Sequence, residues 1–304
     1  MKNFLRNYFP TELALQIYNL LIFIFILVFS GKINDSGFLL SIHLILAILI
    51  GGLQYIKVRY ENIAINFLII VTPVLLFSYF HYETGLINRV IFPDFFDDAI
   101  WNLDRFIFGQ SYHEIWAKAI DSEIVDQLIH FFYFSYYGIL FIPAVLLMIR
   151  ERQNTYNPGW TKLVLTRRLL FTTTFTMLSC YLIFIIYPVK GPVDYHAVLF
   201  PEPKYMVAVM DFLYAHGDTA GGAVPSSHVA VSLVITIFCF RHFKEIRWYL
   251  LVFFIFLAIA TTYCSYHYFV DVLGGVLAGL VFYIMGGKIF DCLCCGTPSG
   301  TGDG

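Results

Sequence analysis

The chain has 304 residues, of which 59% are hydrophobic and 13% are charged, whereas about 25% of residues are charged in a typical soluble domain. This composition indicates a membrane protein and excludes a soluble two-domain enzyme and a disordered regulator. The 19 Lys and Arg are offset by 21 Asp and Glu, so the chain has no basic surplus for binding a nucleic acid.

Eight apolar segments approach the roughly 20 residues that a helix needs to cross a bilayer. In chain order they are Thr11–Ser30, Gly37–Ile56, Ile63–His81, Val125–Met148, Leu169–Tyr187, Ser226–Phe243, Trp248–Ser265 and Tyr268–Lys288. They predict an all-α, polytopic membrane bundle of about eight spans, folded as a single domain over residues 1–295. No small-residue cleavage site follows the first segment, so we interpret it as a retained span. Residues 296–304 are expected to form a flexible tail.

The distribution of Lys and Arg predicts the orientation of the bundle. With eight crossings, both termini and the loops after even-numbered spans share one face, which carries 13 of these residues, and the other face carries 6. The positive-inside rule therefore predicts that both termini are cytosolic.

The two longest connections, Tyr82–Ile124 and Pro188–Pro225, lie on the opposite, extracytoplasmic or lumenal face. Long connections on one side of a bundle commonly build a binding site. Aromatic and charged residues alternate near residues 90–120, which predicts a helical segment lying in the membrane interface. A structural lid and a lipid-guiding element are both compatible with that segment.

A glycine-rich stretch ends in Pro225, Ser226, Ser227 and His228 and then becomes the sixth span. Pro and Ser are typical of a helix start, and the free N–H groups of a helix start can bind a phosphate. Taken alone, the motif is also compatible with an ordinary helix N-cap followed by a histidine that has no functional role.

Two more residues of interest, His267 and Asp271, stand four residues apart at the start of the last span, and therefore on one helical face. A carboxylate beside one imidazole nitrogen fixes the tautomer and leaves the other nitrogen free to attack. A purely structural ion pair is the alternative for these two residues. Lys190, just past the fifth span, reaches the same face. Taken alone it is compatible with an interfacial anchor, but beside two histidines and a helix start we interpret it as a phosphate partner.

The order Lys190-Gly-Pro, Pro-Ser-Ser-His228 and His267-x-x-x-Asp271 resembles the type 2 phosphatidic acid phosphatase superfamily. The tail Tyr-His-Tyr-Phe-Val-Asp and the upstream Trp-Asn-Leu-Asp-Arg-Phe-Ile-Phe-Gly look more like the inositol phosphorylceramide synthase and sphingomyelin synthase branch. The resemblance covers about residues 90–287. It implies that His267 is the nucleophile that takes the phosphoryl group and Asp271 its orienting carboxylate. It further implies that His228 is the general acid and that Ser226 and Ser227 cradle the phosphate.

Two departures from the phosphatase pattern bear on the reaction. Ala260 and Thr261 stand where the phosphatases carry Ser-Arg, and no Arg lies between Lys190 and His228. A dianionic phosphomonoester is neutralised less well without these guanidinium groups than a singly charged phosphodiester. The resemblance therefore implies a lipid phosphotransferase that acts through a phosphohistidine, with ceramide, diacylglycerol or an inositol-type acceptor. A lipid phosphate phosphatase is the alternative, and a non-catalytic lipid transporter or scaffold is a distant one.

The pattern predicts no metal and no cofactor, because it offers no metal-ligand spacing and both histidines already have roles. Membrane lipids are the expected partners. The identity of donor and acceptor, the membrane and the oligomeric state cannot be predicted. The second long connection contains Asp194, Tyr195 and His196, which are compatible either with binding a headgroup or with capping a turn. Near the end of the last span, Cys292, Cys294 and Cys295 are compatible either with palmitoylation or with ordinary interfacial cysteines.

Overall fold

The computed structural model describes residues 9–60, 62–120, 122–153, 163–217 and 219–295. Within these ranges the regular structure is helical and no strand is present, apart from one isolated bridge between Val189 and Gly222. The long helices are α2 (Pro10–Val28), α3 (Ser36–Arg59), α4 (Ile63–Ile87), α7 (Glu123–Gln153), α8 (Val164–Ile186), α11 (Ser227–His242), α12 (Arg247–Tyr263) and α13 (Phe269–Cys295). The expected flexible tail, residues 296–304, lies outside the described residues.

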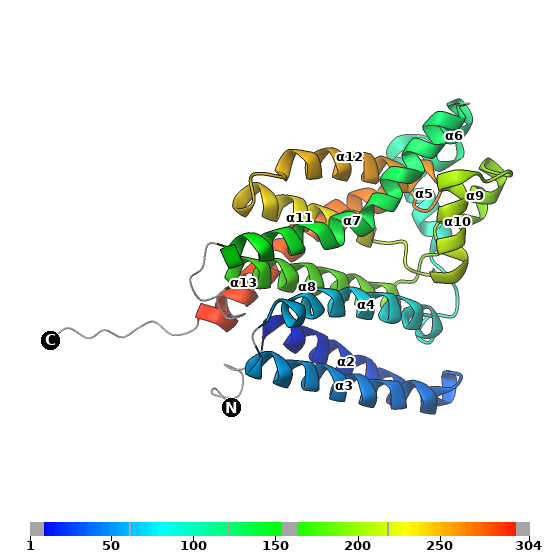
Figure 1. Cartoon of the computed structure of the whole chain (residues 1–304). Helices are drawn as coiled ribbons and strands as arrows, with labels where there is room; N and C mark the ends of the chain where they lie inside the picture. The colour runs from blue at the N-terminus through cyan, green and yellow to red at the C-terminus, as the bar shows by residue number, and fades with distance from the viewer. Residues whose placement is uncertain (1–8, 61, 121, 154–162, 218, 296–304) are drawn as a thin grey trace.

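Eight long helices run side by side, and this confirms the predicted all-α membrane bundle (Figure 1). The beginning of α2 and the end of α13 lie at one end of the bundle. Four short helices gather at the opposite end, namely α5 (Asp97–Phe108), α6 (Trp116–Ala119), α9 (Val193–Leu199) and α10 (Tyr205–Gly217). We refer to these four helices as the cap. The segment expected in the membrane interface, near residues 90–120, supplies α5 and α6.

Six of the eight expected spans are helices long and apolar enough to cross a bilayer. The other two, α11 and α12, have 16 and 17 residues. At about 1.5 Å per residue, they fall short of the roughly 30 Å of a hydrocarbon core.

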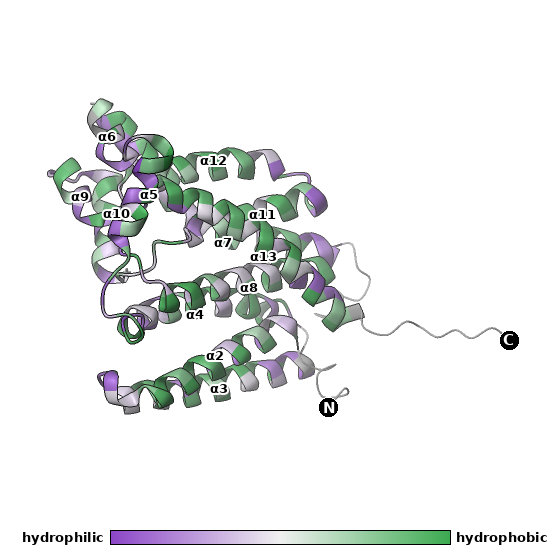
Figure 2. Cartoon of the chain, turned by 180° about the vertical axis from the view of Figure 1, so that it is seen from behind, coloured by the Kyte–Doolittle hydropathy of each residue, from purple (hydrophilic) through white to green (hydrophobic). Residues whose placement is uncertain are grey.

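Several helices continue beyond the apolar segments that predicted them. The span expected at Val125–Met148 is part of a helix that extends to Gln153, because Arg150 and Arg152 are good helix formers that extend it past the apolar run. Figure 2 shows the apolar residues along the helix bodies and the polar residues gathered at the two ends of the bundle.

The interior of the bundle is built around α8, which packs against α2, α4, α7, α11 and α13. In its most apolar window 72% of the residues are buried, against 17–44% in the other five long candidate spans. This central helix ends at Ile186, directly before the segment that contains Lys190.

A close crossing joins α11 to α13. A Cβ atom added at Gly275 would stand 2.6 Å from the carbonyl oxygen of Ser226, and one at Gly279 would stand 2.8 Å from that of Ala230. Glycines four residues apart let two membrane helices approach this closely. The crossing holds the start of α11, with Ser226 and His228, against the start of α13, with His267 and Asp271.

We expect Gly275→Ala to destabilise the protein by about 1–3 kcal/mol, the usual cost of overpacking, because the new methyl group collides with backbone that cannot rotate away. Gly274→Ala is the matched control, since its Cβ would lie 3.6 Å from Pro225, an ordinary contact. Thermal unfolding of the two variants in detergent measures the difference. Equal stability would contradict the close crossing.

Candidate functional site

His267 lies in a tight turn between α12 and α13. The N–H groups of Tyr266 and His267 both donate to the carbonyl oxygen of Thr261, at 3.1 and 3.0 Å. Ser265 adopts a φ of 56°, a left-handed conformation that serine rarely adopts, and its hydroxyl donates to the carbonyl oxygen of His113. This turn presents the His267 ring at the start of α13 with a side chain that is only 5% exposed.

Asp271 stands behind the His267 ring, as the four-residue spacing predicts. Its Oδ2 atom lies 3.4 Å from Nδ1 of His267 and accepts a hydrogen bond of 2.9 Å from the N–H of Tyr268. A distance of 3.4 Å is long for a hydrogen bond, and catalytic contacts of this kind commonly tighten when substrate binds. The carboxylate is fully buried, so its charge acts on the imidazole with little solvent screening.

The other nitrogen of His267 faces the start of α11. Its Nε2 lies 3.3 Å from the hydroxyl oxygen of Ser226, and the N–H of Ser226 donates to the carbonyl oxygen of Asp271. The sequence predicts the helix start correctly, since α11 begins at Ser227 with Ser226 as its N-cap residue. Ser226 makes no side-chain capping hydrogen bond, however, because its hydroxyl is turned toward His267.

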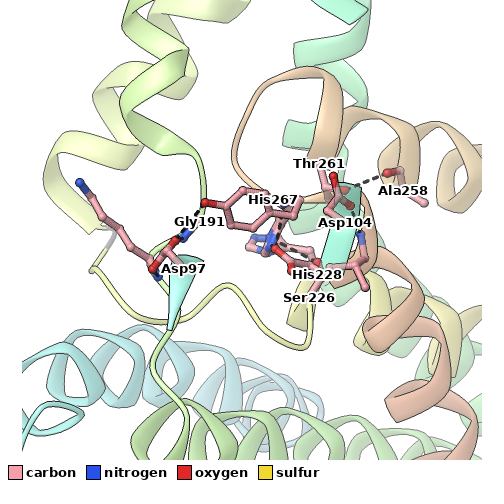
Figure 3. Close-up of polar contacts among 12 residues, drawn as sticks. Asp97, Asp104, Gly191, Ser226, His228, Ala258, Thr261 and His267 are labelled. Atoms are coloured by element: carbon pink, nitrogen blue, oxygen red, sulfur yellow. Dashed lines mark hydrogen bonds and ion pairs between the residues drawn. The ribbon is translucent and has the colours of Figure 1, made fainter. Parts of the chain in front are cut away.

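His228 completes the cluster, as Figure 3 shows. The centres of the His228 and His267 rings are 6.0 Å apart, so both side chains can contact a single phosphate group. The Nδ1 atom of His228 is buried and has no hydrogen-bond partner among the described residues. The first N–H groups of α11 also have no carbonyl partner within the helix, as at every helix start.

A cavity of about 320 Å³ lies beside His228 and Ser227. Its wall is aromatic: the Tyr133 ring lies 5.1 Å and the Tyr136 ring 4.4 Å from the His228 ring, between centres. The hydroxyl of Tyr133 is 3.5 Å from Nε2 of His228 and 2.5 Å from the hydroxyl of Tyr214 on α10. The sequence analysis missed these tyrosines, because a tyrosine within an apolar span carries no signal of which face it occupies.

The segment that contains Lys190 lies beside the loop that leads to α11. Val189 pairs with the loop before α11, through N–H to O contacts with Gly221 and Ala223 of 3.3 and 2.9 Å. The Lys190 ammonium, however, pairs with Asp194 at 2.5 Å. The other five predicted site residues therefore lie together, namely Ser226, Ser227, His228, His267 and Asp271. The Lys190 ammonium instead forms an ion pair with Asp194 on the cap.

Two carboxylates of α5, missed in the sequence analysis, hold the site from the cap side (Figure 3). Asp97 accepts hydrogen bonds from the N–H groups of Lys190 and Gly191, at 2.8 and 2.9 Å, and lies 3.3 Å from the Tyr268 hydroxyl. Burial and this carboxylate raise the pKa of Tyr268, so its hydroxyl stays protonated and donates. The predicted interfacial helix is thus a structural support of the site.

The second carboxylate of α5, Asp104, caps α13. Its Oδ1 accepts the N–H of Val270 at 2.8 Å, three residues after His267. Burial raises the pKa of Asp104 above its usual range, partly offset by the N–H donors of the helix start. Nearby, burial lowers the pKa of His113 to about 4, so this ring is neutral at pH 7 and packs edge-on against Tyr268. Asp104 belongs to the Trp-Asn-Leu-Asp-Arg motif noted in the sequence, so the motif was the available signal.

No guanidinium replaces the Arg that the phosphatases carry. Thr261 is fully buried, and its hydroxyl donates to the carbonyl oxygen of Ala258 within α12. Among the described residues, the cavity beside His228 is lined by neither Lys nor Arg. This cavity therefore offers a substrate no permanently charged cation from the residues that line it.

The sequence leaves the roles of Asp194, Tyr195 and His196 open, and the structure shows what each of them contacts. Nδ1 of His196 lies 2.7 Å from the carbonyl oxygen of Cys264 and Nε2 lies 2.8 Å from Asp211, which ties α9 to α10 and to the His267 turn. Asp194 pairs with Lys190, and the Tyr195 ring packs edge-on against His113. Among the residues described, no cluster of three or more His, Cys, Asp or Glu suits a metal ion.

A family model described as the PAP2 superfamily matches residues 98–285. The match spans α5 to α13 and includes the five residues gathered at the site, with Lys190. No curated protein and no solved structure matches the chain.

Proposed function

The chain belongs to the PAP2 superfamily, and we propose that it is a lipid phosphotransferase of the inositol phosphorylceramide synthase and sphingomyelin synthase type. Family membership supports phosphatase or phosphotransferase chemistry on lipids. The observation that favours a transferase is the uncharged wall of the His228 cavity, because a phosphodiester carries one negative charge and a phosphomonoester carries up to two.

The first step of the proposed reaction forms a phosphohistidine. Nε2 of His267 attacks the phosphorus of a phospholipid donor, the bond from phosphorus to the leaving oxygen breaks, and His228 gives its proton to that oxygen. Asp271 stabilises the positive charge that develops on the His267 ring. The hydroxyl of Ser226 rests against Nε2 and is free to turn to a phosphoryl oxygen once the nitrogen attacks.

The second step transfers the group to an acceptor. His228, now neutral, takes the proton of a ceramide, diacylglycerol or inositol-type hydroxyl, whose oxygen attacks phosphorus while the bond to Nε2 breaks. Ser227 and the free N–H groups at the start of α11 are the proposed ligands of the phosphoryl oxygens. Positioning and charge neutralisation carry most of the catalysis in this class of reaction. We assign Lys190 a weaker, electrostatic share, since Asp194 already pairs with it.

Product analysis tests the proposal. Purified protein in detergent is incubated with phospholipids labelled in the phosphate, with and without ceramide, diacylglycerol or inositol. A transferase yields a labelled phosphodiester that depends on the acceptor. Free labelled phosphate with every acceptor would instead establish the alternative, a lipid phosphate phosphatase that uses water. Lipid movement across vesicles without any labelled product would favour a transporter.

We further propose that the site faces the extracytoplasmic or lumenal side, from the excess of Lys and Arg at the opposite end. In sealed membranes of known orientation, an impermeant maleimide should label Val198→Cys, a position on α9 with 68% exposure, from the extracytoplasmic or lumenal side. Cys292 and Cys294 are exposed near the end of α13 and serve as internal controls that react only from the cytosolic side. The reverse pattern would invert the orientation.

A further inference from the structure

A second cavity, of about 470 Å³, lies between α3 and α4, far along the chain from His228. It is formed by the connection from α2 to α3, by one side of each helix, and by the residues just after α4. These residues precede the part of the chain that the family model matches. It lies at the same end of the bundle as the cap, where α4 ends.

Three charged side chains line this cavity: Lys32, Asp35 and Arg89. Lys32 and Arg89 lie over the rings of Phe29 and Phe95, at 5.8 and 5.4 Å. Asp35 is the N-cap residue of α3, yet its carboxylate makes no capping hydrogen bond. Within the part of the chain that the structure describes, none of the three forms an ion pair. Two cations and one carboxylate are therefore available to a ligand that carries both signs of charge.

The cavity continues from these charges into an apolar groove between the two helices. Phe38 and Leu39 of α3 face Leu86 of α4 across the cavity, and Tyr82 lies one turn before Leu86. Phe38, Tyr82 and Leu86 are 68%, 56% and 47% exposed, on helices that span the membrane. The groove thus opens to the acyl chains of the bilayer, and its charged mouth lies at the helix ends, at the depth of the lipid headgroups.

A buried polar network reaches the cavity through Tyr79. The hydroxyl of Tyr79, which lines the cavity, donates to Oε1 of Glu83 at 2.8 Å. The same oxygen lies 2.8 Å from Nε2 of His43 on α3, and Asn19 of α2 holds the other His43 nitrogen at 2.7 Å. Both His43 and Glu83 are 1% exposed. Ionisable groups at this depth are costly, and here they join three helices around a cavity that the proposed reaction does not use.

We propose that this cavity binds one phospholipid whose headgroup carries a primary ammonium group. Its phosphate lies between Lys32 and Arg89, its ammonium lies on Asp35, and its acyl chain follows the groove past Leu86. Charge-assisted hydrogen bonds to phosphate and ammonium supply the specificity, and the apolar groove supplies contact area. The proposal does not depend on the reaction assigned to the His228 site.

The site also has a structural link to the reaction site. The amide of Asn88, next to Arg89, donates to the carbonyl oxygen of Ala220 at 2.8 Å. Gly85, which lines the cavity, packs so closely on Thr219 that an added Cβ would overlap the threonine hydroxyl. The end of α4 and the residues just after it therefore border the cavity and also support the loop that leads to Ser226 and His228.

Native mass spectrometry of the purified, delipidated chain with added phosphatidylethanolamine or phosphatidylglycerol tests the proposal. We expect more retained phosphatidylethanolamine than phosphatidylglycerol. Arg89→Gln should lower retention of both lipids by about tenfold, the effect of losing one hydrogen bond to a charged group. Leu86→Trp should do the same by filling the groove, without a change of charge. Asp35→Asn should abolish the preference for the ammonium lipid and leave phosphatidylglycerol binding intact.

Lys204→Gln is the matched control, since Lys204 is exposed at the cap end and lies outside this cavity, 3.9 Å from Glu123. Because the cavity beside His228 is also expected to hold lipid, the readout is the difference between each variant and the parental chain. Equal retention of both lipids by the parental chain would overturn the headgroup assignment. Unchanged retention in both Arg89→Gln and Leu86→Trp would overturn the location.

Discussion

His267→Ala should abolish transfer of the phosphoryl group while the protein remains folded. If Nε2 of His267 is the attacking atom, its removal takes away the nitrogen that forms the covalent intermediate and leaves the Ser226 hydroxyl without its imidazole partner. We expect a loss of about 10⁶-fold, the size seen when the nucleophile of a serine protease is removed. The labelled, acid-labile phosphoenzyme should disappear with the activity.

His216→Ala is the matched control for this variant. His216 lies on α10 at the same end of the bundle and is exposed. Its Nδ1 atom is 2.8 Å from the carbonyl oxygen of Phe212, and its ring packs on the Phe212 ring of the same helix. Its removal should leave turnover and thermal stability unchanged. An acid-labile intermediate that persists in His267→Ala would place the nucleophile elsewhere in the site.

The helical bundle could be predicted from the sequence because membrane insertion depends on local composition. Each long apolar run must satisfy its own backbone hydrogen bonds within the hydrocarbon, and a helix is the solution for a single segment. The runs therefore located all eight long helices. Their ends were less well predicted, because polar residues such as Arg150 continue a helix into water.

The clustering of the candidate site residues could also be predicted, because short-range geometry fixes it. The spacing of His267 and Asp271 and the helix start at Ser226 are local features, and the alternation of spans places both at one end of the bundle. The support of the site could not be predicted, since it depends on contacts over long sequence distances. Asp97 reaches Lys190 and Gly191, and Asp104 reaches Val270, across 93 to 166 residues.

The pairing of the Lys190 ammonium shows why a charge in a motif does not by itself identify a ligand. The position of Lys190 beside two histidines and a helix start predicts a phosphate partner, but Asp194 follows it by four residues and pairs with its ammonium group. The structure adds that Asp97 already occupies the two N–H groups of this turn. We therefore retain the start of α11, where the first N–H groups have no carbonyl partner within the helix, as the proposed ligand of the phosphate.

Asp271→Asn should lower the turnover rate by about 10- to 1000-fold without unfolding the protein, and the structure indicates why the loss is smaller than in a serine protease triad. In such a triad the substituted amide turns its NH₂ toward the imidazole and imposes the wrong tautomer, which costs about 10⁴-fold. Here the N–H of Tyr268 donates to the same Asp271 oxygen that faces His267, at 2.9 Å. That donor requires an oxygen, so the asparagine keeps its carbonyl toward His267 and preserves the tautomer.

The asparagine nevertheless lacks the negative charge beside the ring. An opposite charge within about 4–6 Å stabilises a charged partner by one to three pKa units, each worth tenfold, and the His267 ring becomes positive as its bond to phosphorus forms. Asp271→Asn should therefore slow formation of the phosphoenzyme in single-turnover experiments, whereas Asp271→Ala, which also leaves the Tyr268 N–H unpaired, should lose thermal stability as well. Normal phosphoenzyme formation in a stable Asp271→Asn variant would show that the carboxylate serves the turn and not the reaction.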